Sequence, residues 1–236
     1  MKRAVELFAL EEGTSWSPLV SRTWHAWTPT DGWFISVAAS HWEMVVTRQQ
    51  GMARLTVRGP ETKATAVPIP RDAEFFGIQF SAGTFMPGLP PSRLVDLAVI
   101  LPPVTERSFW LGGSAWDYPS PDRADGFVDR LVRAGVLVHD AVAAEAVHHD
   151  VAGFSVRSLE RRVARATGLS RGAVRRIRRA ERAVDLLSGG VAPSEVARRA
   201  GYADQPHLTR SLRRFAGQTP GQIVVAGVQD GGTERQ

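Results

Sequence analysis

The segment from Ser155 to Thr219 contains the same pattern twice, with the two copies offset by 49 residues. The matching positions are Ser155 and Asp204, Leu159 and Leu208, Arg161 and Arg210, Arg165 and Arg214, Gly168 and Gly217, and Ser170 and Thr219. In each copy a residue type that caps helices precedes a short Arg-rich stretch, which a glycine ends about thirteen positions later. A capped basic helix behind a turn, present twice, is the arrangement that lays two helices into DNA grooves. The repeat therefore predicts two helix-turn-helix units.

Positive charge is concentrated in the same segment. Residues 151–223 hold 15 Arg and five acidic residues, whereas residues 1–150 hold 13 Lys and Arg against 17 acidic residues. A genome rich in G and C would explain why Lys2 and Lys63 are the only lysines, but it would not gather the charge in one segment. Such a concentration is typical of proteins that bind polyanions. Charge and repeat together predict a regulator that binds double-stranded DNA.

Composition argues against several other chemistries. The chain has no Cys, which excludes disulfides, thiolate metal sites and thiol nucleophiles. Its first residues, MKRAVELFALEEG, turn acidic where a signal peptide would be apolar, and no apolar run approaches the roughly 20 residues that span a bilayer. The expectation is a soluble cytoplasmic protein with no membrane partner.

No motif in the sequence indicates an enzyme. Gly112-Gly113-Ser114 lacks the flanking glycine of a nucleophile elbow, and no phosphate-binding GxxxxGK[ST] motif occurs. His25, His41 and Glu43 could supply metal ligands, but His and Glu on alternating strand faces are more often ordinary surface or core residues. We therefore expect no catalytic activity, no metal and no cofactor.

The N-terminal half has the pattern of an antiparallel β-barrel or sandwich. Runs rich in aromatic and β-branched residues, separated by turn residues, predict strands over 19–27, 33–39, 42–48, 53–58 and 74–80. A helix is predicted over 92–101, with Ser92 as its cap, and a further strand over 108–111.

From Asp122 onward the apolar period becomes helical, so the fold class is α+β. The Pro-containing segment 118–121 is the expected boundary. We predict a β-rich domain over 1–120, a helical DNA-binding domain over 121–223 and a disordered tail over 224–236.

In the second unit, a helix begins at Pro193, Gly201 makes the turn and Asp204 caps the next helix. Apolar Leu208, Leu212 and Phe215 share one face of that helix. The side chains that this leaves to meet DNA are Gln205, His207, Thr209, Arg210 and Arg213.

In the first unit Ser155 caps, Leu159 and Val163 face inward, and Arg157, Ser158, Glu160 and Arg161 remain for DNA. Arg suits guanine, and Glu can accept from cytosine. A single helix over 173–188 would join the units, which could then enter successive major grooves about 34 Å apart.

These residues resemble a known family. The run GYADQPHLTRSLRRFAGQTPGQ, residues 201–222, is a close match to the signature of AraC/XylS-type transcription regulators, and SVRSLERRVARATGLS, residues 155–170, resembles their first recognition unit. The resemblance covers about residues 121–223 and implies an all-helical module with two helix-turn-helix units joined by a linker helix. It places base contacts on Arg157, Glu160, Arg161, Gln205, His207 and Arg210, with Thr209 on phosphate.

The resemblance also implies a β-barrel sensor or dimerisation domain of the cupin-like kind ahead of the DNA-binding module. The segment 74–96 is similar to the sensor domains of one AraC-like subgroup. A small-molecule effector could bind there, lined by Trp24, Trp33, Trp42 and Phe76, although core packing explains the same aromatic residues without any ligand.

The resemblance leaves several alternatives open. The β-rich half could serve dimerisation alone in a constitutive DNA binder, and the protein could be a homodimer. An activator would also contact RNA polymerase, whereas a repressor would not need to. A DNA-targeted enzyme is a further alternative, but the methyl-transfer repair proteins that resemble this family need cysteines, which this chain lacks.

Overall fold

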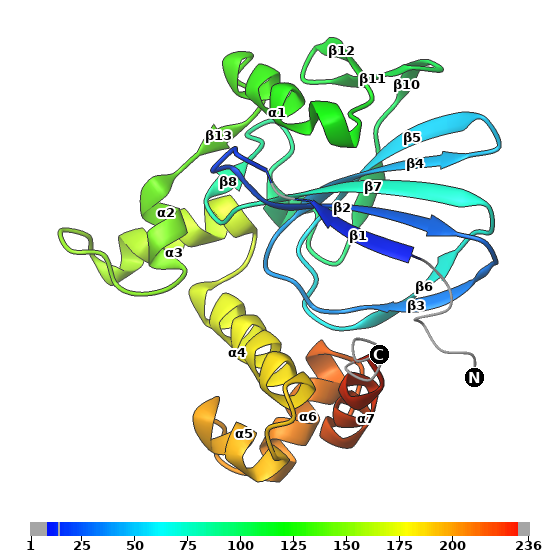
Figure 1. Ribbon diagram of the computed structural model, residues 1–236. Coiled ribbons are helices and arrows are strands. Elements are labelled where there is room, and N and C mark those ends of the chain that lie inside the picture. The colour runs from blue at the N-terminus through cyan, green and yellow to red at the C-terminus, as the bar shows by residue number, and fades with distance from the viewer. Residues whose placement is uncertain (1–8, 14, 231–236) are drawn as a thin grey trace. The chain divides into compact units, whose positions relative to one another are not determined.

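The computed structural model describes residues 9–13 and 15–230, which group into two compact units (Figure 1). The first unit contains the described residues up to Phe34, together with His41–Pro60 and Pro68–Arg171. The second unit contains Ile35–Ser40, Glu61–Val67 and the described residues from Gly172 on. The compact units therefore differ from the predicted domains 1–120 and 121–223, because α-helices up to residue 171 group with the sheets. That residues 1–120 and 121–223 fold as independent domains remains a prediction.

The fold is α+β, as the sequence predicted. The strands are β1 (Ala9–Gly13), β2 (Val20–Thr28), β3 (Gly32–Ser36), β4 (Glu43–Gln49), β5 (Met52–Arg58), β6 (Thr65–Ile69), β7 (Ala73–Phe80), β8 (Thr84–Phe85), β9 (Ala98–Ile100), β10 (Pro103–Thr105), β11 (Ser108–Leu111), β12 (Ser114–Asp117) and β13 (Val138–His139). The α-helices are α1 (Ala124–Arg133), α2 (Ala141–Ala146), α3 (Val156–Thr167), α4 (Arg171–Ser188), α5 (Pro193–Arg199), α6 (Gln205–Phe215) and α7 (Pro220–Asp230), and two 3₁₀ turns are η2 (Pro91–Arg93) and η3 (Pro121–Arg123).

The largest sheet has six strands in the order β1-β2-β7-β4-β5-β9, and each strand is antiparallel to its neighbours. The five strands predicted between residues 19 and 80 correspond to β2, β3, β4, β5 and β7. A two-residue turn, Gln50-Gly51, joins β4 to β5, and both of its residues have positive φ angles (51° and 77°). Such a turn matches the twist of the strands and fixes their register.

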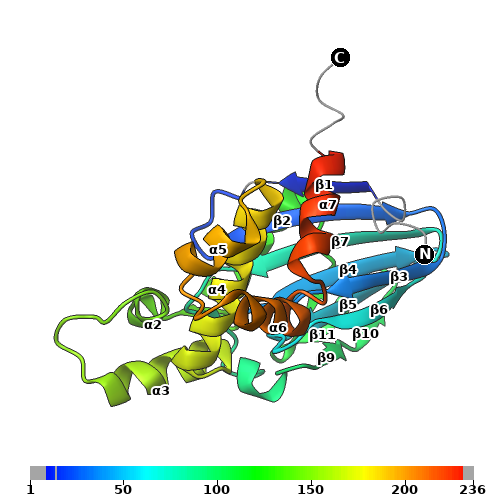
Figure 2. The ribbon, with the colours of Figure 1, turned by 90° about the horizontal axis from the view of Figure 1, so that it is seen from below.

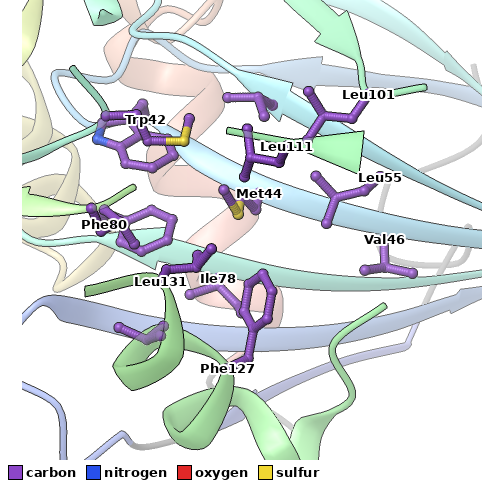
Figure 3. Close-up of a cluster of buried hydrophobic side chains, with 14 of the residues drawn as sticks. Trp42, Met44, Val46, Leu55, Ile78, Phe80, Leu101, Leu111, Phe127 and Leu131 are labelled. Atoms are coloured by element: carbon purple, nitrogen blue, oxygen red, sulfur yellow. The ribbon is translucent and has the colours of Figure 1, made fainter. Parts of the chain in front are cut away.

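One face of this sheet carries the core of the first unit (Figure 3). Side chains that alternate along β4, β5 and β7 point to this face, and all are almost fully buried: Met44, Val46, Leu55, Val57, Phe76, Ile78 and Phe80. Helix α1 covers them with Phe127, Val128 and Leu131. Trp42 stacks on Phe80 with ring centroids 4.0 Å apart, and its indole N–H donates to the Thr84 carbonyl at 2.7 Å.

The helix predicted over 92–101 is wrong. The chain makes only the short turn η2, and Leu94 enters the core. Asp96 then adopts a positive φ of 56°, which an α-helix does not allow, and β9 pairs with β5. The apolar spacing that suggested a helical face comes from a turn and an edge strand instead. The strand predicted over 108–111 is confirmed as β11.

The second unit contains helices α5, α6 and α7 and nearly all of α4, which follow one another in yellow to red in Figure 2. The predicted linker helix over 173–188 is confirmed as α4. Val174, Ile177 and Leu187 are buried on it as predicted, whereas Val184 is half-buried.

The predicted disorder over 224–236 is wrong for 224–230, which belong to α7. Thr219 and Gln222 begin that helix: the Gln222 amide N–H donates to Thr219 Oγ1 at 3.3 Å, and the Thr219 amide N–H donates to Gln222 Oε1 at 2.8 Å. Residues 231–236 lie outside the described residues. No helix in the described part of the chain is both long and apolar enough to cross a membrane.

Candidate nucleic-acid interface

The first helix-turn-helix unit consists of α2, a turn and α3, and side chains cap both helices. Asp140 Oδ1 accepts from the Ala143 amide N–H at 3.0 Å, and Ser155 Oγ accepts from the Ser158 amide N–H at 3.2 Å. Gly168 ends α3 in the left-handed region, with a φ of 73°. The Ser155 cap and the glycine end that the repeat predicted are both confirmed.

A buried arginine holds the turn of this unit in place. The Arg171 side chain, 3% exposed, donates from Nε to the Ala146 carbonyl and from Nη2 to the His149 carbonyl, both at 2.9 Å. Nη2 also lies 2.9 Å from Asp150 Oδ1. Arg171 thus satisfies one carbonyl at the end of α2 and one in the turn that follows it. The sequence alone does not reveal this role, because Arg171 is one of 15 arginines in the basic segment 151–223.

Two of the three predicted base-contacting residues on α3 are available to a ligand. Arg157 and Arg161 are exposed, and in the part of the chain that the structure describes neither has a hydrogen bond or an ion pair. Glu160 differs from them: its Oε2 accepts from the Arg171 amide N–H at 3.2 Å, at the beginning of α4. The carboxylate therefore already serves as an acceptor for the next helix.

Two other arginines of α3 make side-chain contacts within the first compact unit. Arg162 donates to Asp140 Oδ2 at 2.8 Å, and its guanidinium lies 5.2 Å from the centroid of the Phe154 ring. Arg165 lies 5.2 Å from the centroid of the Phe85 ring. These contacts orient α3 and leave its exposed side to Arg157 and Arg161.

The second helix-turn-helix unit, formed by α5 and α6, has the caps, turn and buried face that the sequence predicted. Gly201 makes the turn with a φ of 72°, and Asp204 caps α6 by accepting from the His207 amide N–H at 2.6 Å. Leu208 and Leu212 are fully buried and Phe215 nearly so, as predicted. The proline predicted in the first turn, Pro206, is found there.

Tyr202 packs beneath the turn, where it joins three elements. The Arg179 guanidinium of α4 lies 4.6 Å from the Tyr202 ring centroid, and Arg179 Nη1 donates to the Gly201 carbonyl at 3.2 Å. The Tyr202 hydroxyl is 3.0 Å from Ser211 Oγ of α6. The ring of His207 meets the Tyr202 ring edge-on at 5.2 Å, and this contact leaves His207 half-buried.

On α6, three predicted DNA-contacting side chains project without partners. Gln205, Arg210 and Arg213 are exposed, and no hydrogen bond or ion pair engages their side chains among the described residues. Thr209 is half-buried, and its hydroxyl donates to the Gln205 carbonyl at 3.0 Å, back along the helix. The helix contains no acidic residue, so its own sequence does not neutralise its arginines.

Charge is distributed differently on the neighbouring helix α5. Hydrogen bonds from Arg198 and Arg199 lower the pKa of Glu195 to about 2. Glu195 Oε1 lies 2.5 Å from Arg198 Nη2 and 2.6 Å from Arg199 Nε. The cations of α5 are therefore paired with a carboxylate, while those of α6 remain available to a polyanion.

The four candidate effector-binding residues lie in different surroundings, and two of them lie on opposite faces of the large sheet. Trp42 and Phe76 are core residues, 3% and 1% exposed, whereas Trp33 is 64% exposed. Trp24 pairs with Gly77, so it points to the sheet face opposite Phe76, and its indole N–H donates to Glu43 Oε2 at 3.0 Å. Core packing and hydrogen bonding within the sheet therefore explain three of the four.

The proposed metal ligands are also engaged otherwise. His25 Nε2 lies 2.9 Å from Glu74 Oε1, and Glu43 lies 3.3 Å from Arg58 Nη1. Burial, assisted by Arg22 and Arg58, lowers the pKa of His41 to about 4. No group of three or more His, Asp or Glu side chains that could hold a metal ion occurs in the described residues.

Comparison with known proteins finds a match to a family model within the helical segment. Residues 150–224 match a family model described as a helix-turn-helix domain, of the AraC type. The matched range includes both recognition helices, α3 and α6. This part of the chain is therefore similar to an AraC-type helix-turn-helix domain, as predicted, which supports DNA binding and a role in transcription regulation.

Matches to whole proteins add little. No curated protein sequence matches the chain. A solved structure of ToxT from Vibrio cholerae is 6% identical and covers 93% of this chain and 98% of its own, with a TM-score of 0.32. A similarity this low supports no conclusion about function.

Proposed function

We propose that this protein is a sequence-specific transcription regulator that inserts α3 and α6 into successive major grooves of double-stranded DNA. The observation that carries the proposal is the same in both helices. Each is capped at its N-terminus and buries one apolar face, and each projects exposed polar side chains that lack partners among the described residues. A helix built in this way can give its free donors to base edges and phosphates.

The side chains near the beginning of each helix are the proposed base readers. In the second unit these are Gln205, which suits adenine, and Arg210, which suits guanine. In the first unit they are Arg157 and Arg161. Arg213 lies further along α6, where side chains meet phosphates.

Three other predicted contacts receive smaller roles. Glu160 and Thr209 already have hydrogen-bond partners within the protein, and His207 packs on Tyr202. Each would have to exchange or share a contact to reach a base, at a cost of desolvation. We propose that these three residues stabilise the two recognition helices and contribute less to the choice of DNA sequence.

Selection from a pool of random-sequence duplexes tests this proposal. The full chain should enrich one site with two preferred segments, one for each recognition helix, whose centres lie about one helical turn, 10–10.5 base pairs, apart. Binding should weaken steeply as salt rises, because arginine contacts release counterions. A protein that enriches no sequence, at any salt concentration that keeps it folded, is not a sequence-specific regulator.

Effector control is the second part of the proposal. A depression of about 460 Å³ at one end of the large sheet is lined by His25, Trp27, Arg48, Gln49, Gln50, Gly51, Asp72 and Glu74. Its mixed charges and one indole suit a small polar molecule better than the buried aromatic core does. A thermal-shift screen against small molecules tests this, because a ligand of the native state raises the Tm. Hits should be lost in Arg48→Ala. A screen without hits favours the constitutive alternative, in which the β-rich half only dimerises.

A further inference from the structure

The C-terminal end of the second recognition helix is completed by two segments from the N-terminal half of the chain. We call residues 35–40 and 61–67 together the strap; both belong to the same compact unit as α6. The Ala38 amide N–H donates to the Phe215 carbonyl at 2.7 Å, and the Ala64 amide N–H donates to the Arg214 carbonyl at 2.8 Å. These carbonyls lie in the last turn of α6, where the carbonyl groups have no amide donors within the helix.

The strap is itself an ordered structure. Ala39 and Glu61 exchange two backbone hydrogen bonds, both of 2.9 Å, and Ser36 Oγ donates to Glu61 Oε2 at 2.7 Å. Its two segments connect through a few residues to β4 and β5 of the large sheet. The last turn of α6 therefore binds a braced pair of segments.

Gly217 is the point of closest approach. It follows α6 with a φ of 69°, and a Cβ added there would lie 2.9 Å from Ile35 Cγ2 and 3.2 Å from Ala64 Cβ. The equivalent glycine of the first unit, Gly168, is also packed against the N-terminal half: its Cβ would lie 2.7 Å from the Pro91 carbonyl carbon and from Ser92 N. The same repeat position thus meets an N-terminal segment in both units, through different residues each time.

We propose that the strap positions the second recognition helix for DNA reading, so that residues 35–40 and 61–67 set which bases Gln205 and Arg210 can reach. This rests on the proposed function. An 11-residue helix is about 16 Å long, so a tilt of about 10° at its C-terminal end moves its N-terminal end by roughly 3 Å. A displacement of even 1 Å breaks directional hydrogen bonds, whereas phosphate contacts tolerate it better. Loss of the strap contact should therefore reduce sequence preference before it reduces overall DNA affinity.

Gly217→Ala in the full chain tests the proposal, with Gly190→Ala as the matched control. Both glycines have positive φ angles (69° and 79°), but a Cβ at Gly190 meets nothing within 4 Å. The two variants share the backbone strain, and only Gly217→Ala pushes on the strap. In selection from random duplexes, Gly217→Ala should lose on the order of tenfold of its preference at the segment read by α6, and none at the segment read by α3. Adding Ile35→Ala, which removes the obstructing Cγ2, should restore preference in part.

Uniform loss at both segments in Gly217→Ala, or equal loss in Gly190→Ala, would show that the contact acts through stability alone and would overturn the proposal. So would a variant that keeps the wild-type preference. These outcomes differ from failure of the proposed function, in which the wild-type chain itself enriches no sequence.

A second variant keeps the proposal testable if Gly217→Ala does not fold. Ala64→Pro removes the amide N–H that donates to the Arg214 carbonyl and adds no atom at residue 217. It should lose preference at the segment read by α6 and keep it at the segment read by α3. Lys63→Pro is the control, since the Lys63 amide makes no hydrogen bond among the described residues. Equal loss in both proline variants, or unchanged preference in Ala64→Pro, contradicts the proposal.

Discussion

The two helix-turn-helix units are built to one plan but use their recognition helices differently. In the first, Glu160 completes the next helix, Arg162 pairs with Asp140 and Arg165 packs on Phe85. In the second, Thr209 stands where Glu160 stands in the first and bonds only within its own helix. Much of the polar face of α3 is thus engaged in the protein, whereas Gln205, Arg210 and Arg213 of α6 are all exposed.

This difference shows that the residues that form each helix recur in the two copies, whereas the partners of the polar side chains do not. Caps, buried leucines and terminal glycines recur at matched positions because they act locally or on the nearest neighbour helix. The side chains between them take whatever partners surround each copy. We therefore expect α6 to contribute more of the sequence preference than α3.

The largest expected effect comes from the matched buried leucines, Leu159 and Leu208. Replacing either by Ala should cost about 2–5 kcal/mol of unfolding free energy, because both side chains are essentially fully buried. All seven Trp belong to the first compact unit, so their emission reports on that unit. Leu159→Ala should lower the urea midpoint followed by Trp emission more than Leu208→Ala does. In Leu208→Ala, the helical circular dichroism signal should begin to fall at a lower urea concentration than the Trp emission signal changes. Equal shifts in both signals would mean that the units unfold together.

Low pH should reduce the stability of the first compact unit, which contains His41. His41, in the first unit, has its pKa held at about 4 by burial and by nearby Arg22 and Arg58. The unfolded chain then binds a proton that the native state refuses, so stability falls as the pH drops from about 6.5 to about 4, by on the order of 3 kcal/mol in total.

Urea unfolding followed by Trp emission at pH 7 and pH 5 checks this prediction. His41→Gln should reduce the loss of stability between the two values. If that variant shows the same pH dependence as the wild-type chain, His41 is not the group responsible.

Arg210 and Arg161 occupy the same position in the repeat and test the unequal use of the two helices. Arg210→Ala should cost about 1–3 kcal/mol of specific binding and relax preference at one base position. Arg161→Ala should relax preference in the other segment by no more than that. Arg107→Ala, in the turn between β10 and β11, removes the same charge and should leave preference unchanged in both segments. A larger effect of Arg161→Ala would reverse the comparison.

The smallest expected effect is at the caps. Ser155→Ala and Asp204→Ala should each cost about 1 kcal/mol of unfolding free energy. The loss should be greater for Asp204, since its carboxylate accepts at 2.6 Å and carries a charge at the helix N-terminus, whereas the Ser155 hydroxyl accepts at 3.2 Å. Asp204→Asn keeps an acceptor and serves as the control. A greater loss for Ser155→Ala would indicate that the charge contributes little.

The elements of both units could be predicted from sequence because their signals are local. Ser155 and Asp204 are cap residues, and Leu208 and Leu212 follow a helical period. The helix over 92–101 was predicted wrongly because the structure there depends on residues distant in the sequence. Leu94 is held by the core, and β9 forms because it pairs with β5. Arg171, Arg179 and Glu160 could not be assigned because their partners lie far along the chain or depend on the geometry of a turn.

The sequence by itself determined that two capped basic helices exist and that they belong to a helix-turn-helix domain, since caps, apolar period and charge are properties of short segments. Only the tertiary structure decided which arginines stay available to DNA and that residues 35–40 and 61–67 complete α6. Backbone hydrogen bonds between distant segments leave no mark in residue type, because Ala38 and Ala64 contribute only amide groups that every residue except proline carries.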